Sequence, residues 1–188
     1  GVFTGIGEFS IHKEFVSAKV SGDVASLIDP AVDRFFDFTA ESGLLSILHS
    51  DIHMPFVKPE FRRLYFDQAV ALFRRHPNST IIWAHTGLGR VVQPVSDHLA
   101  MLEEILADPG LKHVYFDISW DEVAKYVVAT PDATRQTTAL IEKYPDRFLF
   151  GSDNVALTEP QALFAVFNQY EPLWDALSPE ASEAVRKG

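Results

Sequence analysis

Five short apolar segments of this chain each end in a residue that can bind a metal ion or transfer a proton. The segments are GIGE, SILH, IIWAH, VYFD and FLFGSD, and they end at Glu8, His49, His85, Asp117 and Asp153. Successive end residues are 32 to 41 positions apart, which is the length of one strand plus one crossover helix. Functional side chains at the carboxyl ends of successive parallel strands are typical of a (β/α) barrel. We therefore expect an α/β protein whose site lies at one edge of a parallel sheet.

Helical periodicity fills the intervals between these segments. Strands are predicted over 5–10, 44–49, 80–85, 114–119 and 148–153, and helices over 30–42, 60–75, 90–106, 131–144, 159–170 and 178–187, with a further helix beginning near Asp121. Gly43 is expected to end the first helix, and Ser178 followed by Pro179 to start the last. Since strands alternate with helices throughout, the sheet should be parallel.

The chain length limits how much of a barrel it can form. A complete eight-unit TIM barrel takes about 250 residues, whereas this chain has 188 residues and five recognisable units. We expect residues 1–188 to form a single, incomplete barrel domain. Five parallel strands cannot close a barrel, and open sheet edges invite pairing. The expectation is a homo-oligomer or a missing N-terminal segment.

Charge and composition exclude several classes of partner. The net charge of −10 argues against sequence-independent nucleic-acid binding. No apolar run approaches the ~18 residues needed to cross a bilayer, and the chain does not begin with a signal-peptide pattern. Thiolate chemistry is excluded because cysteine is absent. We expect a cytoplasmic protein that acts on a small molecule rather than on nucleic acid or a membrane.

His49 and His85 are the strongest candidates for metal ligands. Each ends an apolar strand and is followed by a loop, and neutral imidazole suits zinc, manganese or iron. Asp153 could bind the same metal and also take a proton from metal-activated water. Its alternative role is a turn or helix cap, which Asp favours. Glu8 is either a further ligand or the ion-pair partner of Lys13.

The remaining polar residues receive lesser roles. His12, His53 and Asn154 are candidate substrate contacts at the mouth of the site, and Asp117 is expected to be a structural anchor. We expect solvated side chains for His76, His98 and His113, and packing roles for Trp83 and Trp120. The glycines in Gly87–Arg90 lack the G-x-G-x-x-G spacing of a dinucleotide site and are expected to form a tight turn.

These segments, in this order and spacing, resemble the amidohydrolase superfamily, in particular its metal-dependent TIM-barrel hydrolases and decarboxylases. The matching stretches are GIGE at 5–8, ILHSD at 47–51, WAHTGLGR at 83–90, VYFDIS at 114–119 and LFGSDN at 149–154. The closing LWDALSPEASEAVRKG is similar to the C-terminal helix of that group. The resemblance covers nearly the whole chain.

The resemblance implies a role for each matching residue. His49 would be the metal ligand of barrel strand 5 and His85 that of strand 6. Asp153 would be the strand 8 aspartate that binds metal and moves the proton. Glu8 would lie at the end of strand 4, where some relatives place a bridging carboxylate or a carbamylated lysine. Asp117 would end strand 7, which is not usually a ligand position.

One departure from the pattern affects the metal site. The group places a His-x-His pair at the end of strand 1, and this sequence contains no His-x-His. Strands 1 to 3 have no counterpart here, so the chain resembles the last five βα units of an eight-unit barrel. The expected cofactor is a divalent metal, zinc first, and its absence is the alternative.

Four functions are left open by these observations. The first is a metal-dependent hydrolase that cleaves a C–N or C–O bond of a small molecule with metal-activated water. A decarboxylase at the same site is the close variant. A metal-dependent deoxyribonuclease is opposed by the acidic charge and by the sequence FSIH after Glu8. The last is a non-catalytic, metal-free barrel fragment or scaffold.

Overall fold

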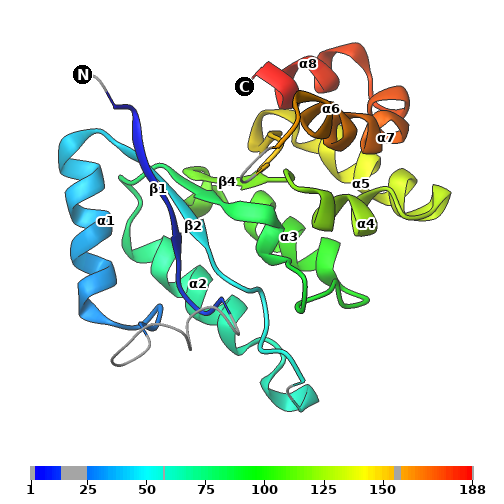
Figure 1. The fold of residues 1–188 in the computed structure, drawn as a ribbon. Coiled ribbons are helices and arrows are strands. Elements are labelled where there is room, and N and C mark those ends of the chain that lie inside the picture. Colours follow the sequence, from blue (N-terminus) through cyan, green and yellow to red (C-terminus); the bar gives the residue numbers. More distant parts are fainter. Residues whose placement is uncertain (1–2, 14–24, 57, 155–157, 188) are drawn as a thin grey trace.

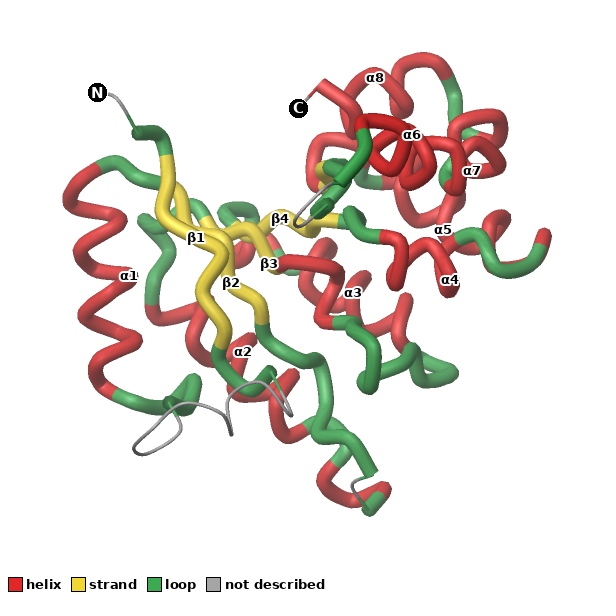
Figure 2. Tube along the Cα trace, viewed as in Figure 1, coloured by secondary structure: helices red, strands yellow, loops and turns green. Residues whose placement is uncertain are grey.

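The protein forms one five-stranded parallel sheet with helices between the strands (Figures 1 and 2). The computed structural model describes residues 3–13, 25–56, 58–154 and 158–187. The strands are β1 (Gly5–Ser10), β2 (Leu45–His49), β3 (Ile81–Trp83), β4 (Val114–Asp117) and β5 (Phe148–Leu149). Their spatial order is β1-β2-β3-β4-β5, and each neighbouring pair is parallel. The predicted parallel (β/α) architecture is confirmed.

All the α-helices except α7 fall in the intervals in which helical periodicity was found. They are α1 (Pro30–Ser42), α2 (Leu64–Arg75), α3 (His98–Ala107), α4 (Asp121–Val127), α5 (Pro131–Lys143), α6 (Pro160–Gln169), α7 (Glu171–Ala176) and α8 (Pro179–Lys187). The ends of α1 show why the sequence determines its bounds. The Asp29 carboxylate accepts a hydrogen bond from the Ala31 amide, and Gly43 ends the helix with a left-handed φ of 68°.

The strand order fixes where the helices lie. Because each strand pairs with the next one along the chain and such crossovers are right-handed, the connecting helices cover the same face of the sheet. Three further helices, α6, α7 and α8, gather at the C-terminal end of the chain, drawn orange to red in Figure 1. The backbone amide of Phe150, just after β5, bonds the carbonyl of Val185 in α8 and so ties this group to the sheet.

Aromatic side chains fill the core between the sheet and its helices. Trp83 of β3 is fully buried, and its ring packs against those of Phe66, Phe73 and Phe116 at centroid distances of 5.5 to 6.4 Å. The indole Nε1 donates a 2.7 Å hydrogen bond to the Ser50 carbonyl oxygen. The expected packing role of Trp83 therefore includes holding the residue that follows His49.

Several predicted boundaries were wrong. The segment 80–85 is a strand only over Ile81–Trp83, and β5 ends at Leu149 rather than at Asp153. The helix expected from about residue 90 begins at His98, because Pro94 has no amide hydrogen and restricts the residue before it. Helix α7 was not predicted.

Among the described residues, none of the helices is long and apolar enough to cross a bilayer.

Candidate metal centre

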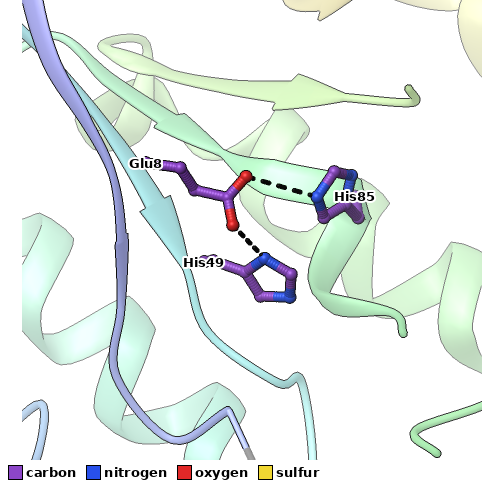
Figure 3. Close-up of side chains that lie close together, drawn as sticks. All are labelled: Glu8, His49 and His85. Atoms are coloured by element: carbon purple, nitrogen blue, oxygen red, sulfur yellow. Dashed lines mark hydrogen bonds and ion pairs between the residues drawn. The ribbon is translucent and has the colours of Figure 1, made fainter. Parts of the chain in front are cut away.

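Three candidate ligands converge at the carboxyl edge of the first three strands. Glu8 lies in β1, His49 is the last residue of β2, and His85 follows β3 by two residues. One atom from each side chain can be chosen so that all three lie within 4.8 Å of one another. Figure 3 shows the Glu8 carboxylate between the two imidazole rings, with one oxygen directed toward each ring. Oε1 bonds Nδ1 of His49, and Oε2 lies 3.4 Å from Nε2 of His85.

Two buried nitrogen atoms in this cluster lack hydrogen-bond partners within the described part of the chain. They are Nε2 of His49 and Nε2 of His85, on side chains that are 1 and 2% exposed. Leaving a buried polar atom unpaired costs about 1–3 kcal/mol, so native structures seldom tolerate two side by side. With the Glu8 carboxylate lying between the two rings, unpartnered imidazole nitrogens of this kind are suitable ligands for a divalent ion.

The other side of the His85 ring is held by Asp117. Oδ2 of Asp117 lies 3.2 Å from Nδ1 of His85 and also accepts hydrogen bonds from the His85 amide and the Ser119 hydroxyl. A carboxylate on the second nitrogen of a ligand histidine orients the ring and makes it a better donor to metal. Asp117 thus anchors His85, a candidate metal ligand.

The His49 ring has a cation beside it. Nζ of Lys13 lies 2.9 Å from Nδ1 of His49 and 3.7 Å from the Glu8 carboxylate. Nδ1 cannot accept a hydrogen bond from the ammonium and donate one to the carboxylate at the same time. The structure shows the ion pair of Glu8 with Lys13, and the role of Glu8 as a metal ligand stays a prediction.

The electrostatics of the cluster favour positive charge at its centre. Burial alone would raise the pKa of Glu8, but the adjacent His49 and His85 hold it well below its usual value. Burial alone would lower the pKa of His85, but Asp117 and Glu8 raise it to about 9. His49 has a lowered pKa because of burial. The field that retains a proton on His85 would equally favour a metal cation.

Asp153 flanks the cluster from the loop after β5. Its Oδ2 lies 3.6 Å from Nε2 of His85, and its backbone has a left-handed φ of 45°. Burial raises the pKa of this carboxyl above its ordinary value. Asp153 therefore adjoins His85 without being part of the compact group of Glu8, His49 and His85.

The backbone around His85 makes a left-handed turn. His85, Thr86 and Gly87 have φ values of 56°, 52° and 72°, a region that costs non-glycine residues roughly 1–2 kcal/mol each. Hydrogen bonds from three other segments support this turn. Asp117 accepts from the His85 amide, the Gly87 carbonyl accepts from the Ile52 amide at 2.8 Å, and the Thr86 carbonyl lies 3.0 Å from Nε2 of His98.

The expectation that His76, His98 and His113 are solvated was wrong. His76 and His98 are buried, and His113 is half-buried. His98 starts α3, where its Nε2–H donates to the Thr86 carbonyl oxygen. This hydrogen bond replaces one that the buried His98 side chain would otherwise make with water. It also holds Thr86 in the turn that contains His85.

The burial of His98 predicts a pH-dependent stability. Burial lowers the pKa of His98 from 6.5 to about 4, so the unfolded chain takes up a proton before the folded chain does. The contribution of His98 is fully present above pH 6.5 and is lost as the pH falls toward about 4, by about 3 kcal/mol in total. Urea unfolding at pH 7, 5.5 and 4.5 measures it, with His98→Gln as the comparison. Identical pH profiles for the two proteins would contradict this assignment.

Gly87 allows a second prediction about the turn. A Cβ atom at Gly87 would lie 2.7 Å from Cβ of Ile52, whereas one at Gly43, which has a similar φ, would meet nothing within 4 Å. Gly87→Ala should therefore lower the free energy of unfolding by the cost of a left-handed alanine plus about 1–3 kcal/mol for overpacking. Gly43→Ala should lower it only by the cost of the left-handed alanine. Urea unfolding of the two variants gives the difference. Equal losses would show that Ile52 yields to the added methyl group.

The three candidate substrate contacts bind to the protein itself. Nε2 of His12 lies 3.2 Å from Gln68 and from Ser26, and its ring stacks on Tyr65. The two ring nitrogens of His53 lie 3.1 and 3.0 Å from the carbonyl oxygens of Met54 and Gln93. The Asn154 amide donates to the Ala162 carbonyl at 3.0 Å. None of these three residues belongs to the compact group of Glu8, His49 and His85.

Trp120 and His98 lie near the centre at positions that were not predicted from the sequence. The Trp120 ring lies 5.0 Å from the His85 ring and 6.4 Å from the His49 ring, measured between centroids. Its position directly after the strand-end segment 114–119 was the one signal for such a role. No comparable signal marked His98, because its partner is a backbone carbonyl twelve residues earlier.

A parallel β/α sheet with a histidine–carboxylate cluster at its carboxyl edge defines a protein of the TIM-barrel type with a candidate metal centre. The sequence profile of a family described as Amidohydrolase matches residues 11–188. The chain belongs to this family. No curated protein matches the sequence.

Solved structures support the fold. An amidohydrolase from Burkholderia multivorans, crystallised with bound zinc, is 17% identical, with a TM-score of 0.52 over 85% of this chain and 55% of that chain. Dihydroorotase from Campylobacter jejuni is 12% identical, with a TM-score of 0.51 over 96% of this chain and 57% of that chain. This chain thus spans little more than half the length of these structures, as expected of a partial barrel.

Proposed function

We propose that this chain carries the metal centre of a metal-dependent hydrolase that acts on a C–N or C–O bond of a small molecule. The observation that carries the proposal is the compact group of Glu8, His49 and His85, in which the buried Nε2 atoms of both histidines lack a hydrogen-bond partner among the described residues. Glu8, His49 and His85 would hold the ion, and zinc is the first candidate because it favours such nitrogen and oxygen ligands. A bound divalent ion supplies Lewis-acid activation of water and substrate.

The protein's own groups have separate tasks in this proposal. Asp117 holds the His85 ring in one orientation through Nδ1. Lys13 places a positive charge beside Glu8 and His49, where it can neutralise charge on an acidic group. Asp153, half-buried and with a raised pKa, is the group best suited to take and return a proton. Trp120 covers one side of the two rings and limits the access of water.

We propose that turnover requires the sheet to be completed. The edge of β1 opposite β2 has no partner strand among the described residues, and the barrel relatives are longer than this chain. Either a preceding segment or a second copy of this chain could supply the remaining units. Metal binding needs only residues from β1, β2 and the turn after β3, so it can be measured on the 188-residue chain itself.

The direct test is calorimetric titration of chelator-treated protein with zinc. We expect one equivalent of zinc to bind. Glu8→Gln should weaken the affinity at least tenfold, because the neutral amide loses the carboxylate's charge between the two rings. Glu41→Gln is the matched control, since Glu41 is an exposed glutamate on α1, and it should bind as the parent does. If neither zinc nor manganese shows saturable binding, the metal-free scaffold is favoured instead. If zinc binds but the completed barrel turns over no lactone or amide, the hydrolase assignment is overturned.

A further inference from the structure

A cavity lies among the helices on the outer side of the sheet. It has a volume of about 230 Å³ and is lined by residues of α3, α4 and α5 and of the segment between β3 and α3, which includes Thr86. Ile118, which follows β4, and Phe148 of β5 complete the lining. None of the three clustered ligand candidates lines it. An engineered apolar cavity of about 150 Å³ is known to bind benzene, so this one has room for a single aromatic ring with a polar substituent.

The cavity wall is mainly apolar, with Leu, Val, Ile and Phe side chains. Its one acidic residue, Asp132, pairs with Arg135 and accepts a 2.5 Å hydrogen bond from Gln136. The lining contains no lysine or arginine. Such a wall does not favour an anion, and the charge of Asp132 is already compensated. The cavity therefore suits an uncharged ligand.

Besides hydroxyl-bearing side chains such as those of Tyr126, Thr130 and Thr137, the wall holds one imidazole, that of His98. Its side chain lines the cavity and is 95% buried, since the residue is 5% exposed. Nε2 lies 3.0 Å from the Thr86 carbonyl oxygen, which fixes the proton on Nε2 because a carbonyl only accepts. Nδ1 is consequently a hydrogen-bond acceptor. Within the described part of the chain, no hydrogen bond is made to Nδ1.

We propose that this cavity is a second ligand site, which takes an uncharged, single-ring aromatic molecule that donates a hydrogen bond to Nδ1 of His98. Apolar burial of the ring supplies the affinity, and the unpaired acceptor selects ligands with a hydroxyl or N–H group. The same imidazole holds the Thr86 carbonyl through Nε2, and Thr86 follows His85. A ligand on Nδ1 would therefore act on the turn that positions the candidate metal ligand.

Phenol and fluorobenzene are the probes, because they match in size and only phenol donates a hydrogen bond. Ligand-observed NMR titration of the full chain gives both dissociation constants. We expect phenol to bind about fivefold to tenfold more tightly, as one hydrogen bond implies. Ala133→Trp should abolish the binding of both probes by filling the cavity, which Ala133 lines. Ala139→Trp, on the exposed side of the same helix, should leave both unchanged.

Histidine variants test the selectivity. His98→Phe should remove the preference for phenol, whereas His113→Phe should retain it, since His113 also bonds a backbone carbonyl but does not line the cavity. If circular dichroism shows that His98→Phe is unfolded, two other measurements test the proposal. They are the preference of the parent protein for phenol and the loss of phenol binding in Ala133→Trp. The proposal is overturned if phenol does not bind, if it binds Ala133→Trp as well as the parent, or if it binds no better than fluorobenzene.

Discussion

Replacing His85 by asparagine should weaken zinc binding by at least about 100-fold, which corresponds to about 2.7 kcal/mol. His85 is the candidate ligand with the most support around it, because Asp117 holds both its ring and its backbone amide. Asparagine is the informative substitution because it tolerates the left-handed backbone at this position better than most residues. The variant should therefore keep the turn and lose the imidazole. Calorimetric titration with zinc measures the affinity, and circular dichroism checks the fold.

His113→Asn is the matched control for this experiment. His113 is another histidine held by a backbone carbonyl, that of Phe73 at 3.0 Å, but it precedes β4 at the opposite end of that strand from Asp117. Its removal should leave zinc affinity unchanged. If His85→Asn bound zinc as tightly as the parent, His85 could not be a ligand and the cluster would lose its basis.

Trp83→Ala should lower the free energy of unfolding by about 3–5 kcal/mol, because it empties a large site at the centre of the core. The indole is fully buried among Phe66, Phe73 and Phe116, and its removal leaves both a cavity and an unpaired Ser50 carbonyl. Domains of this size are stable by about 5–15 kcal/mol, so the variant should be only marginally folded. Urea unfolding at 25 °C measures the change.

Trp174→Ala is the comparison for the core substitution. Trp174 packs on Phe150 and Tyr170 but is only half-buried, so its loss should be clearly smaller. Equal losses of unfolding free energy would mean that the C-terminal helices stabilise the protein as much as the central strand does. Trp83→Phe should fall between the parent and Trp83→Ala, because it keeps most of the packing and loses the hydrogen bond.

The sequence predicted the order and type of most elements because the strands are apolar runs and some of the helices have clear end signals. Gly43, for example, ends α1 as expected. Boundaries failed where tertiary contacts decide the conformation. The backbone of His85 leaves the strand because Asp117, Ile52 and His98 offer partners to the left-handed turn, and no local pattern announces those contacts.

The candidate site was partly predictable for the same reason. Strand ends converge in a parallel sheet, so Glu8, His49 and His85 could be placed together from their spacing alone. The positions of His12 and His53 could not, because each is set by hydrogen bonds to groups far along the chain, such as Gln68 and the Gln93 carbonyl. Asp117 was expected to be an anchor, but which residue it anchors depends on the pairing of β3 with β4.

Substitutions in the left-handed turn at His85 could raise the stability of the protein and at the same time weaken metal binding. Thr86→Gly would relieve the unfavourable φ of 52°, but it would also remove the hydroxyl that bonds the His85 carbonyl at 2.7 Å and give the backbone more freedom beside the ligand. A laboratory evolution experiment that rewarded only thermal tolerance would be free to relax this turn. One that also required bound zinc would have to keep the strained conformation, so the two regimes should diverge first at residues 85–87.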